Sequence, residues 1–412
     1  MKLKLWAKIL IAMCLGLISG LVIGERAEFL KPVGTIFLNL ISMIIVLLVF
    51  ASMTVGITSI HDPKKLGRLG LKTLAYYLST TVISILLGIT AAYLFKPGLG
   101  LELTVERPLR ITEPSGIGDI LLSIIPSNPI ASLVSGNVLQ IIVFSLFLGV
   151  AINMAGERGR PLLDVIESLA DVMYKVTGIV MEFSPLGVFA IMAWISGTMG
   201  SAVLFHLAKF ILIYYVICLL FVATVFCGIL RLIAGVSPMI FFRGMSDAIM
   251  VAFSTGSSSA TLPVSMRCAT ENLGVSKSIT SFVLPLGSTV NMNGTAIFQG
   301  MSAIFVSQAY GIQLDLYTLV ALVITATLSA IGTAGIPGSG FIMLSAVLTS
   351  AGLPIEGLAI LAGIDRLRDM VGTVLNILGD AVVAVAVARS EQELDMSCYA
   401  SEGAMVLEGS EV

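Results

Sequence analysis

Long apolar runs separated by short polar segments occupy the first 235 residues of the chain. Several runs approach or exceed the roughly 20 residues that an α-helix needs to cross a bilayer core. The pattern predicts six membrane-spanning helices, at residues 5–24, 33–58, 70–95, 129–154, 162–195 and 203–233. One long polar connection, at 97–119, contains Pro97, Pro108 and Pro114 and separates the third span from the fourth.

After residue 235, two apolar runs are interrupted by glycine, proline and small hydroxyl residues. The interruptions read FSTGSSSATLPVS at 253–265 and LSAIGTAGIPGSG at 328–340, and neither contains a charge. Irregular backbone at membrane depth is tolerated only inside protein or along a cavity, and paired interruptions point to a transporter's binding site. We therefore favour two re-entrant hairpins over the alternative of extramembrane loops. The expected segments are hairpins at 238–270 and 315–351, helices at 277–309 and 354–389, and a disordered tail at 390–412.

Composition supports the membrane assignment. Hydrophobic residues form 57% of the chain and charged residues only 12%, against about 25% charged residues in a soluble domain. We therefore expect an all-α membrane protein. The net charge is −2, and no basic patch that would bind nucleic acid is present. The five cysteines are scattered without C-x-x-C spacing, so neither a metal site nor a disulfide framework is expected.

Lysine and arginine orient the predicted spans, because positive residues accumulate on the cytoplasmic side of a membrane. Basic residues precede the first span and follow the second and the fourth: Lys2, Lys4, Lys8, Lys64, Lys65, Arg68, Lys72, Arg158 and Arg160. The N-terminus imitates a signal peptide but lacks a small-residue cleavage site and continues into Glu25 and Arg26. We expect a multi-pass protein of the plasma or inner membrane with both termini in the cytoplasm.

The predicted last helix carries the residues that are most costly to place in a membrane. Six residues recur at a spacing that places them on one helix face: Asp365, Asp369, Gly372, Thr373, Asn376 and Asp380. Intramembrane charges usually mark a pathway or a site. The alternative is an internal ladder of ion pairs with Arg366, at the edge of this stripe, and Arg368, well off it. A ladder does not account for Asp380, because the nearest basic residue along the helix, Arg389, lies more than two turns away.

The stretch VNMNGTAIF, residues 290–298, places oxygen atoms in an otherwise apolar run. The side chains of Asn291, Asn293 and Thr295, with backbone carbonyls freed at Gly294, suit a small cation or a polar solute. The alternative is hydrogen bonding between membrane helices. Three such residues beside two interrupted segments favour a site.

Other functional classes find less support. Ser258 would need a nearby base to act as a nucleophile, and the only histidines, His61 and His206, lie outside its segment. No G-x-x-x-x-G-K-[ST] motif is present, so ATP does not drive a process within this chain. We expect neither an enzyme nor a bound cofactor. A passive, anion-conducting channel is the alternative from another class.

Four motifs in the C-terminal half resemble, in order and spacing, those of the dicarboxylate/amino acid:cation symporter family: GSSSATLPVSM, LPLGSTVNMNGTAIFQG, IGTAGIPGSG and DMVGTVLNILGD. The resemblance looks continuous over about residues 5–389. It implies a homotrimer whose protomers have eight transmembrane helices, two re-entrant hairpins and inverted repeats. Residues 1–66 and 120–199 would form the trimer scaffold. Residues 67–96 and 200–389 would form a transport domain that moves like an elevator, with the second hairpin as its gate and 97–119 as an extracellular loop.

The resemblance also implies residue roles. Substrate-binding positions are Gly256, Ser257, Ser258, Thr295, Gly335, Ile336, Pro337, Gly338, Ser339, Gly340, Asp369, Gly372, Thr373 and Asn376. Asp369 would take the substrate ammonium, whereas Ser257, Ser258 and Asn376 would hold the α-carboxylate. Positions for coupled sodium ions or protons form three groups: Gly287, Asn291, Asn376 and Asp380; Thr289, Met292, Ala330, Ile331 and Thr333; and Tyr77, Thr80, Thr81, Asn291 and Asn293.

Three positions depart from the family pattern. Gly372 stands where the acidic-substrate members place an arginine. Gly256 replaces an arginine that some members carry at the first hairpin and others carry in the last helix, and Asn293 replaces the family's usual aspartate. Because a buried substrate carboxylate needs a paired cation, and because glycine supplies no charge and leaves space for a neutral side chain, Gly372 predicts a neutral amino acid as substrate. The alternative is an acidic amino acid or C4-dicarboxylate, with Arg366 as an approximate stand-in. The loss of a carboxylate at Asn293 predicts weaker or fewer sodium sites.

Overall fold

A computed structural model describes residues 5–58, 63–101, 103, 125–135, 138–199, 202–331, 333, 335 and 337–399. Apart from connecting segments and one isolated β-bridge between Val275 and Leu394, these residues are helical, as predicted. Among them, three helices are long and apolar enough to cross a membrane: Leu69–Phe95, Val203–Ala234 and Asp365–Ser390. The number rises to four if Arg160–Val180 and Pro185–Thr198, bent by 52°, form a single span.

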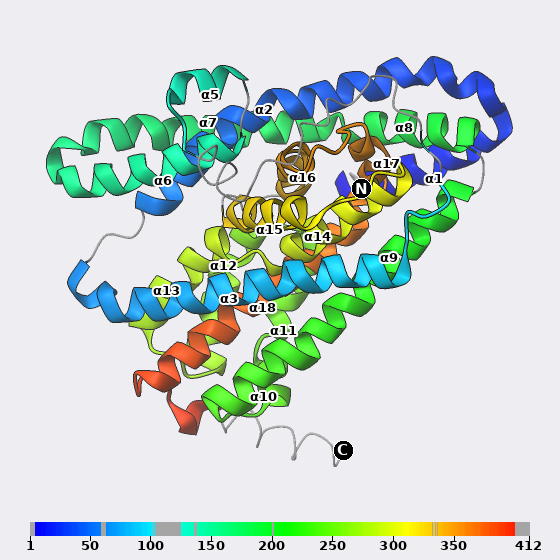
Figure 1. Cartoon of the computed structure of the whole chain (residues 1–412). Helices are drawn as coiled ribbons and strands as arrows, with labels where there is room; N and C mark the ends of the chain where they lie inside the picture. The colour runs from blue at the N-terminus through cyan, green and yellow to red at the C-terminus, as the bar shows by residue number, and fades with distance from the viewer. Residues whose placement is uncertain are drawn as a thin grey trace, which may run out of the picture.

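Helices from the first half of the chain, except α3, form an N-terminal group (Figure 1). Its members are α1 (Leu5–Ile23), α2 (Lys31–Thr58), α5 (Pro129–Ser135), α6 (Val138–Ala155), α7 (Arg160–Glu182) and α8 (Ser184–Met199). Helix α1 packs along α8, and α2 contacts α6, α7 and α8. Gly16 allows the close approach of α1, because a Cβ atom there would lie 2.5 Å from the carbonyl oxygen of Phe189. Large apolar side chains such as Val22 and Phe147 are exposed, which suits a surface covered by lipid or another apolar surface.

The remaining helices form a C-terminal group. Its members are α3 (Pro63–Phe95), α9 (Ala202–Phe221), α10 (Pro238–Gly244), α11 (Ser246–Thr255), α12 (Ser258–Arg267), α13 (Lys277–Val290), α14 (Asn293–Ala309), α15 (Leu316–Ile331), α16 (Ser339–Ser350), α17 (Gly357–Ala362) and α18 (Asp365–Ser390). Helix α9 continues through two π-helical segments to Ala234. Helices α10 to α12 correspond to the first predicted hairpin, called hairpin 1. Helices α15 and α16 correspond to the second, called hairpin 2.

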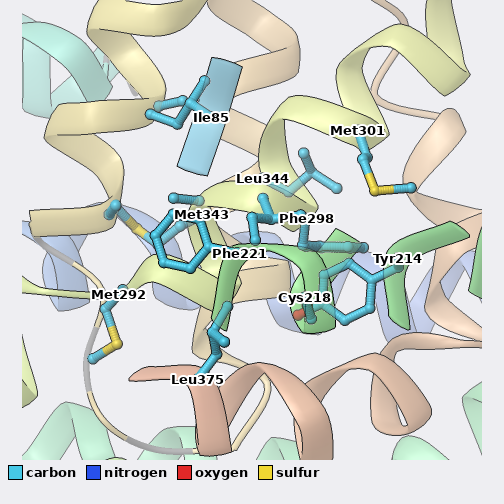
Figure 2. Packing of buried hydrophobic residues seen from close by; sticks show 14 of the residues in the cluster. Ile85, Tyr214, Cys218, Phe221, Met292, Phe298, Met301, Met343, Leu344 and Leu375 are labelled. Atoms are coloured by element: carbon cyan, nitrogen blue, oxygen red, sulfur yellow. The ribbon is translucent and has the colours of Figure 1, made fainter. Parts of the chain in front are cut away.

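Helix α18 lies at the centre of the C-terminal group and contacts α9, α11, α12, α13 and α14. Apolar side chains from several helices pack together in this core (Figure 2). They include Tyr214, Cys218 and Phe221 of α9, Phe298 and Met301 of α14, Met343 and Leu344 of α16, and Leu375 of α18. Apart from the exposed Arg389, the charged residues of α18 are buried and therefore enclosed by protein rather than presented to lipid.

One predicted span of the N-terminal group is bent in the structure, because the prediction at 162–195 becomes α7 and α8. Pro185, the second residue of α8, cannot donate a backbone hydrogen bond to the preceding turn. Helix α7 carries six charged residues and α8 carries none, so polarity also changes at this bend. The prediction at 129–154 covers α5 and α6, and the two residues between these helices lie outside the described residues.

Two predicted helices of the C-terminal group are also interrupted. The helix expected at 277–309 ends as α13 and restarts as α14, because Asn291 and Met292 have φ/ψ values of −114°/79° and −106°/62°. The break therefore precedes Gly294, which is helical, and corrects the expectation of freed carbonyls at that glycine. The helix expected at 354–389 becomes α17 and α18.

Residues 391–399, expected to belong to a disordered tail, are folded against the C-terminal group. The backbone N–H of Ser276 donates to the carbonyl of Glu393 at 3.2 Å. The hydroxyl of Tyr399 donates to the carbonyl of Ser237 at 2.9 Å, and the Tyr399 ring is buried. The rest of the predicted tail lies outside the described residues.

Candidate substrate and cation site

Three helix N-termini converge on the charged half of α18. Helix α12 begins after Ser257, whose hydroxyl accepts a hydrogen bond from the backbone N–H of Ala260 at 3.1 Å. Helix α14 begins at Asn293, and α16 begins after Gly338, whose φ of +80° lies in the left-handed region. Unpaired N–H groups and the helix dipole make such ends favourable for an anion. The arrangement therefore suits a substrate carboxylate.

The tips of the two hairpins touch each other and α18. The hydroxyl of Ser257 donates to the carbonyl of Gly335 at 2.7 Å, and the backbone N–H of Ser259 donates to the same oxygen at 3.0 Å. The backbone N–H of Gly338 donates to Oδ2 of Asp369 at 3.3 Å. Three predicted substrate elements, hairpin 1, hairpin 2 and the α18 stripe, are thus brought together. We call this area the substrate region.

Two aspartates and two arginines form a buried cluster on the first turns of α18. Arg368 donates from Nε and Nη2 to Oδ1 of Asp365 at 2.8 and 2.5 Å. Asp369 lies between the arginines, with Oδ1 3.3 Å from Nη1 of Arg368 and Oδ2 3.6 Å from Nη1 of Arg366. The ion-pair ladder considered from the sequence therefore exists. The two arginines lie farther from the Asp369 carboxylate than Arg368 lies from Asp365, so Asp369 is held less firmly than Asp365.

Gly372 does not open a space for a neutral side chain, which corrects the reason given for that prediction. A Cβ atom on Gly372 would lie 2.7 Å from the hydroxyl oxygen of Tyr214. That hydroxyl donates to the carbonyl of Gly294 at 3.1 Å, and a Cβ atom on Gly294 would overlap the backbone of Gly372. Gly372 is thus a point of close helix contact between α18 and α14.

The other departure, Gly256, lies directly beside an arginine. Gly256 ends α11 with a φ of +62°, and a Cβ atom there would lie 2.5 Å from Nη1 of Arg366. Nη2 of Arg366 donates to the carbonyl of Thr255 at 2.9 Å. The guanidinium of Arg366 therefore occupies the space next to the hairpin 1 tip.

Asn376 joins the substrate region to the start of α14. Its Oδ1 accepts from the backbone N–H of Gly294 at 2.8 Å, and its Nδ2 donates to Sδ of Met292 at 3.1 Å. Thr295 lies against Gly340, where a Cβ atom would be 3.1 Å from the threonine hydroxyl. The remaining predicted substrate residues Ser258, Ser339 and Thr373 are buried, and Pro337 is partly buried. Ile336 lies outside the described residues.

The first predicted cation group is assembled around Asp380. Nδ2 of Asn291 donates to Oδ1 of Asp380 at 3.0 Å. Gly287 faces this carboxylate and Tyr77, since a Cβ atom there would lie 2.5 Å from both Cγ of Asp380 and the tyrosine hydroxyl oxygen. That hydroxyl donates to the carbonyl of Val283 at 2.8 Å. The carboxylate is buried, which favours either a neutral form or a bound cation.

The third predicted cation group forms a chain of hydrogen bonds between neutral side chains. Oδ1 of Asn291 accepts from Nδ2 of Asn293 at 3.0 Å and from the hydroxyl of Thr80 at 3.3 Å. The hydroxyl of Ser84 donates to Oδ1 of Asn293 at 3.2 Å. Ser84 was not predicted, although it lies one helical turn after Thr80. We call Tyr77, Thr80, Ser84, Asn291, Asn293 and Asp380 the cation region. Thr81 is buried close to it on α3.

The second predicted cation group is less closely connected. The hydroxyl of Thr289 donates within its own helix to Leu286, and that of Thr333 donates to Ser329. The last turn of α13 does border hairpin 2, because a Cβ atom on Gly335 would lie 3.2 Å from the carbonyl oxygen of Ser288. Ala330 is buried and Ile331 partly buried at the end of α15. The structure thus places this group at the α13–hairpin 2 border without direct hydrogen bonds between its hydroxyls.

Comparison with known proteins gives a family match over nearly the whole chain. A model of the sodium:dicarboxylate symporter family matches residues 5–390. The proton/glutamate-aspartate symporter of Escherichia coli K12 is 37% identical over 96% of this chain and 94% of that protein. The proton/sodium-glutamate symport protein of Geobacillus stearothermophilus is 36% identical over 92% and 93%. The C4-dicarboxylate transport protein of Pectobacterium atrosepticum is 32% identical over 95% and 93%.

These matches confirm the resemblance inferred from the four motifs and the expectation of a transporter rather than an enzyme. The three relatives are named for glutamate, aspartate or C4-dicarboxylates, and none of the three is named for neutral amino acids. They therefore favour the acidic-substrate alternative over the neutral substrate predicted from Gly372. Their names also include both protons and sodium as coupled ions.

Proposed function

Because the chain belongs to the sodium:dicarboxylate symporter family, we propose that it carries an acidic amino acid, aspartate or glutamate, together with sodium ions or protons. The observation that supports this substrate most directly is the placement of Arg366 and Arg368. Their guanidinium groups approach Gly256 and Gly372, the two positions at which the family pattern has an arginine. The positive charge that an acidic substrate needs is therefore available near both glycines.

The substrate region offers a complementary group for each charge of an acidic amino acid. The α-carboxylate fits the converging N-termini of α12 and α14, near Ser257 and Asn376. The ammonium fits Asp369, whose contacts with the two arginines are long enough to be replaced. The second carboxylate requires a cation, because a buried unpaired charge costs several kcal/mol.

A C4-dicarboxylate is the second candidate, favoured by the Pectobacterium relative and by the presence of two arginines in the cluster. Such a substrate has no ammonium, so Asp369 would repel it unless that carboxylate stayed paired with both arginines. Asp369 therefore favours the amino acid over the dicarboxylate.

We further propose that the C-terminal group of helices moves as the transport domain against the N-terminal group. The exposed apolar side chains of the N-terminal group suit contacts with lipid and with other protomers of a trimer. Hairpin 2 would act as the gate, because the N–H of Gly338 at its tip bonds directly to Asp369 and must separate to admit a ligand. The distribution of lysine and arginine along the sequence would place both termini in the cytoplasm.

Coupling would depend on Asp380, the charged side chain of the cation region. A sodium ion or a proton would neutralise this buried carboxylate beside Asn291. Because Asn293 supplies no charge, the group with Tyr77, Thr80 and Thr81 would bind sodium weakly, although the buried hydroxyl of Thr81 has no hydrogen-bond partner among the described residues. Fewer coupled ions would follow than in relatives with an aspartate at this position.

Uptake into proteoliposomes tests the proposed function. Radiolabelled aspartate, glutamate, succinate and serine are supplied with an imposed sodium gradient, an imposed proton gradient, or neither. We expect aspartate or glutamate to accumulate above equilibrium under at least one gradient. Preferred uptake of serine or succinate would contradict the proposed substrate, whereas equilibration without accumulation would indicate a passive channel.

A further inference from the structure

Arg368 is the most completely buried charged side chain in the described part of α18. Its side chain has no exposed surface, and two of its donors are fixed by Asp365. The carbon of its guanidinium lies 4.1 Å from the centre of the Phe298 ring, a distance that allows a cation–π interaction. The Asp365 carboxylate and the Phe298 ring thus hold this guanidinium in one orientation.

The third nitrogen of this guanidinium, Nη1, is not engaged in the same way. It has no hydrogen-bond partner among the described residues, although Oδ1 of Asp369 lies 3.3 Å away. Leaving a buried charged donor without a hydrogen bond is costly. An acceptor bound at Nη1 would remove that cost.

The surroundings of Nη1 are those of the substrate region. A Cβ atom on Gly340 would lie 3.2 Å from Nη1, and one on Gly372 would lie 3.8 Å from it. Gly340 also borders the hydroxyl of Thr295. Nη1 therefore faces the place where α14, α16 and α18 meet, under the arm of hairpin 2 that follows its tip. Opening of hairpin 2 would uncover this nitrogen.

Arg366 differs from Arg368 in how its donors are used. Its Nη2 bonds to the carbonyl of Thr255, and its Nη1 lies beside the left-handed turn at Gly256. Both terminal nitrogens of Arg366 are thus directed at hairpin 1 or Asp369. This arginine stabilises the hairpin 1 tip, although its buried Nε has no hydrogen-bond partner among the described residues, whereas Nη1 of Arg368 lies beside Gly340 of hairpin 2 and Gly372.

We propose that Arg368, and not Arg366, binds the second carboxylate of the substrate and thereby determines the preference for an acidic side chain. The inference rests on the proposed function and adds which residue recognises the side chain. When the substrate ammonium binds Asp369, that carboxylate is neutralised, and Nη1 of Arg368 becomes available to the second carboxylate. Asp365 acts as a positioning residue, because it keeps Arg368 oriented throughout this exchange.

The test compares Arg368→Gln with Arg366→Gln, which remove the same charge from neighbouring positions. Affinities for aspartate and for asparagine, which has the same shape without the second charge, are measured by competition with the radiolabelled substrate. We expect Arg368→Gln to lower the aspartate-to-asparagine affinity ratio about 30-fold or more, the effect of removing one partner of a buried charge pair. Arg366→Gln should keep this ratio within about twofold of the native value.

A second variant guards against misfolding, because Arg368→Gln leaves Asp365 buried without its partner. Asp365→Asn with Arg368→Gln removes both charges of the pair and should show the same fall in the ratio. An unchanged ratio in either Arg368 variant, or a larger change in Arg366→Gln, overturns the proposal. If the native protein binds neither aspartate nor glutamate, the proposed function itself fails. If the native protein binds aspartate, but the aspartate-to-asparagine affinity ratio does not change in the Arg368 variants, only the present inference fails.

Discussion

The substrate region and the cation region each lack charged residues of the family pattern, but the side chains next to the substituted positions differ in charge between the two regions. Near Gly372 and Gly256, the guanidinium groups of Arg368 and Arg366 lie close to the places where the missing side chains would begin. Near Asn293, the neighbours are Asn291, a neutral amide, and Ser84, a hydroxyl. Positive charge thus lies beside both glycines of the first region, whereas the hydrogen-bond partners given for Asn293 in the second are neutral.

The difference shows that a departure from a motif must be interpreted with its spatial neighbours. An arginine can be relocated because its side chain is long enough to reach the same space from another turn of the helix. An aspartate that binds an ion cannot be relocated so easily, since its short side chain must lie within bonding distance of the ion. A relocated arginine would therefore preserve the charge available to a substrate, whereas a lost aspartate would change the ion coupling.

Asp369→Asn is expected to have the largest effect on the substrate region. Loss of the carboxylate leaves the substrate ammonium without a counter-charge, so the affinity for aspartate should fall about 100-fold or more. The affinity for succinate, which has no ammonium, should not fall and serves as the control. Binding is measured by competition in detergent. An unchanged aspartate affinity would mean that Asp369 serves only as a partner of Arg366 and Arg368.

Gly372→Arg tests whether the relocated charge can be returned to its position in the family pattern. Because its Cβ would lie 2.7 Å from the Tyr214 hydroxyl, the single change should destabilise the protein by about 1–3 kcal/mol. Gly372→Arg with Tyr214→Phe should recover part of that loss. Thermal unfolding of the purified variants measures both effects. Equal stability of the single variant and the native protein would contradict the close packing described for Gly372.

Asn293→Asp tests the opposite case, the charge that the cation region has lost. A new carboxylate beside Asn291 and Thr80 should strengthen a sodium site by more than the about 1 kcal/mol of an ordinary hydrogen bond. The dependence of substrate affinity on sodium concentration should become steeper, by about one ion on a log–log plot. A native protein that already couples one sodium ion at each of the three groups would contradict this prediction, as would an unchanged slope in the variant.

Ser84→Ala should have the smallest effect. It removes a hydroxyl whose single hydrogen is shared between the carbonyl of Thr80 at 2.8 Å and Oδ1 of Asn293 at 3.2 Å, so the free energy of unfolding should fall by about 1 kcal/mol. Thr90→Ala on the same helix is the matched control, because its exposed hydroxyl bonds only to Leu86 within the helix. A loss no larger than that of the control would show that Ser84 does not contribute to the amide chain.

The sequence predicted the helical class, both interrupted segments and the polar stripe of the last helix. These features depend on local composition and on helical periodicity, which are visible along the chain. The bend between α7 and α8 was missed because the predicted span was drawn through the charged residues of α7 and through Pro185. The break in the stretch 290–298 was expected at Gly294 and lies instead at Asn291 and Met292.

The roles of individual site residues were harder to predict. Gly372 was interpreted as open space because nothing nearby in the sequence indicates that Tyr214 of α9 packs against it. Arg368 was set aside because its position lies off the polar stripe, although its long side chain returns to the stripe. Helical spacing describes where a side chain begins, and only the packing of neighbouring helices shows where a long side chain ends.

The folded stretch 391–399 has a practical consequence for handling the protein. Glu391 pairs with Lys72 of α3 at 2.5 Å, and Glu393 accepts from the hydroxyl of Ser278 at the start of α13 at 2.7 Å. A truncation placed after Ser390, where the polar tail begins in the sequence, would remove these contacts together with the buried ring of Tyr399. Affinity tags and fluorescent fusions should therefore follow Tyr399, which leaves the junction of α3, α13 and hairpin 1 intact.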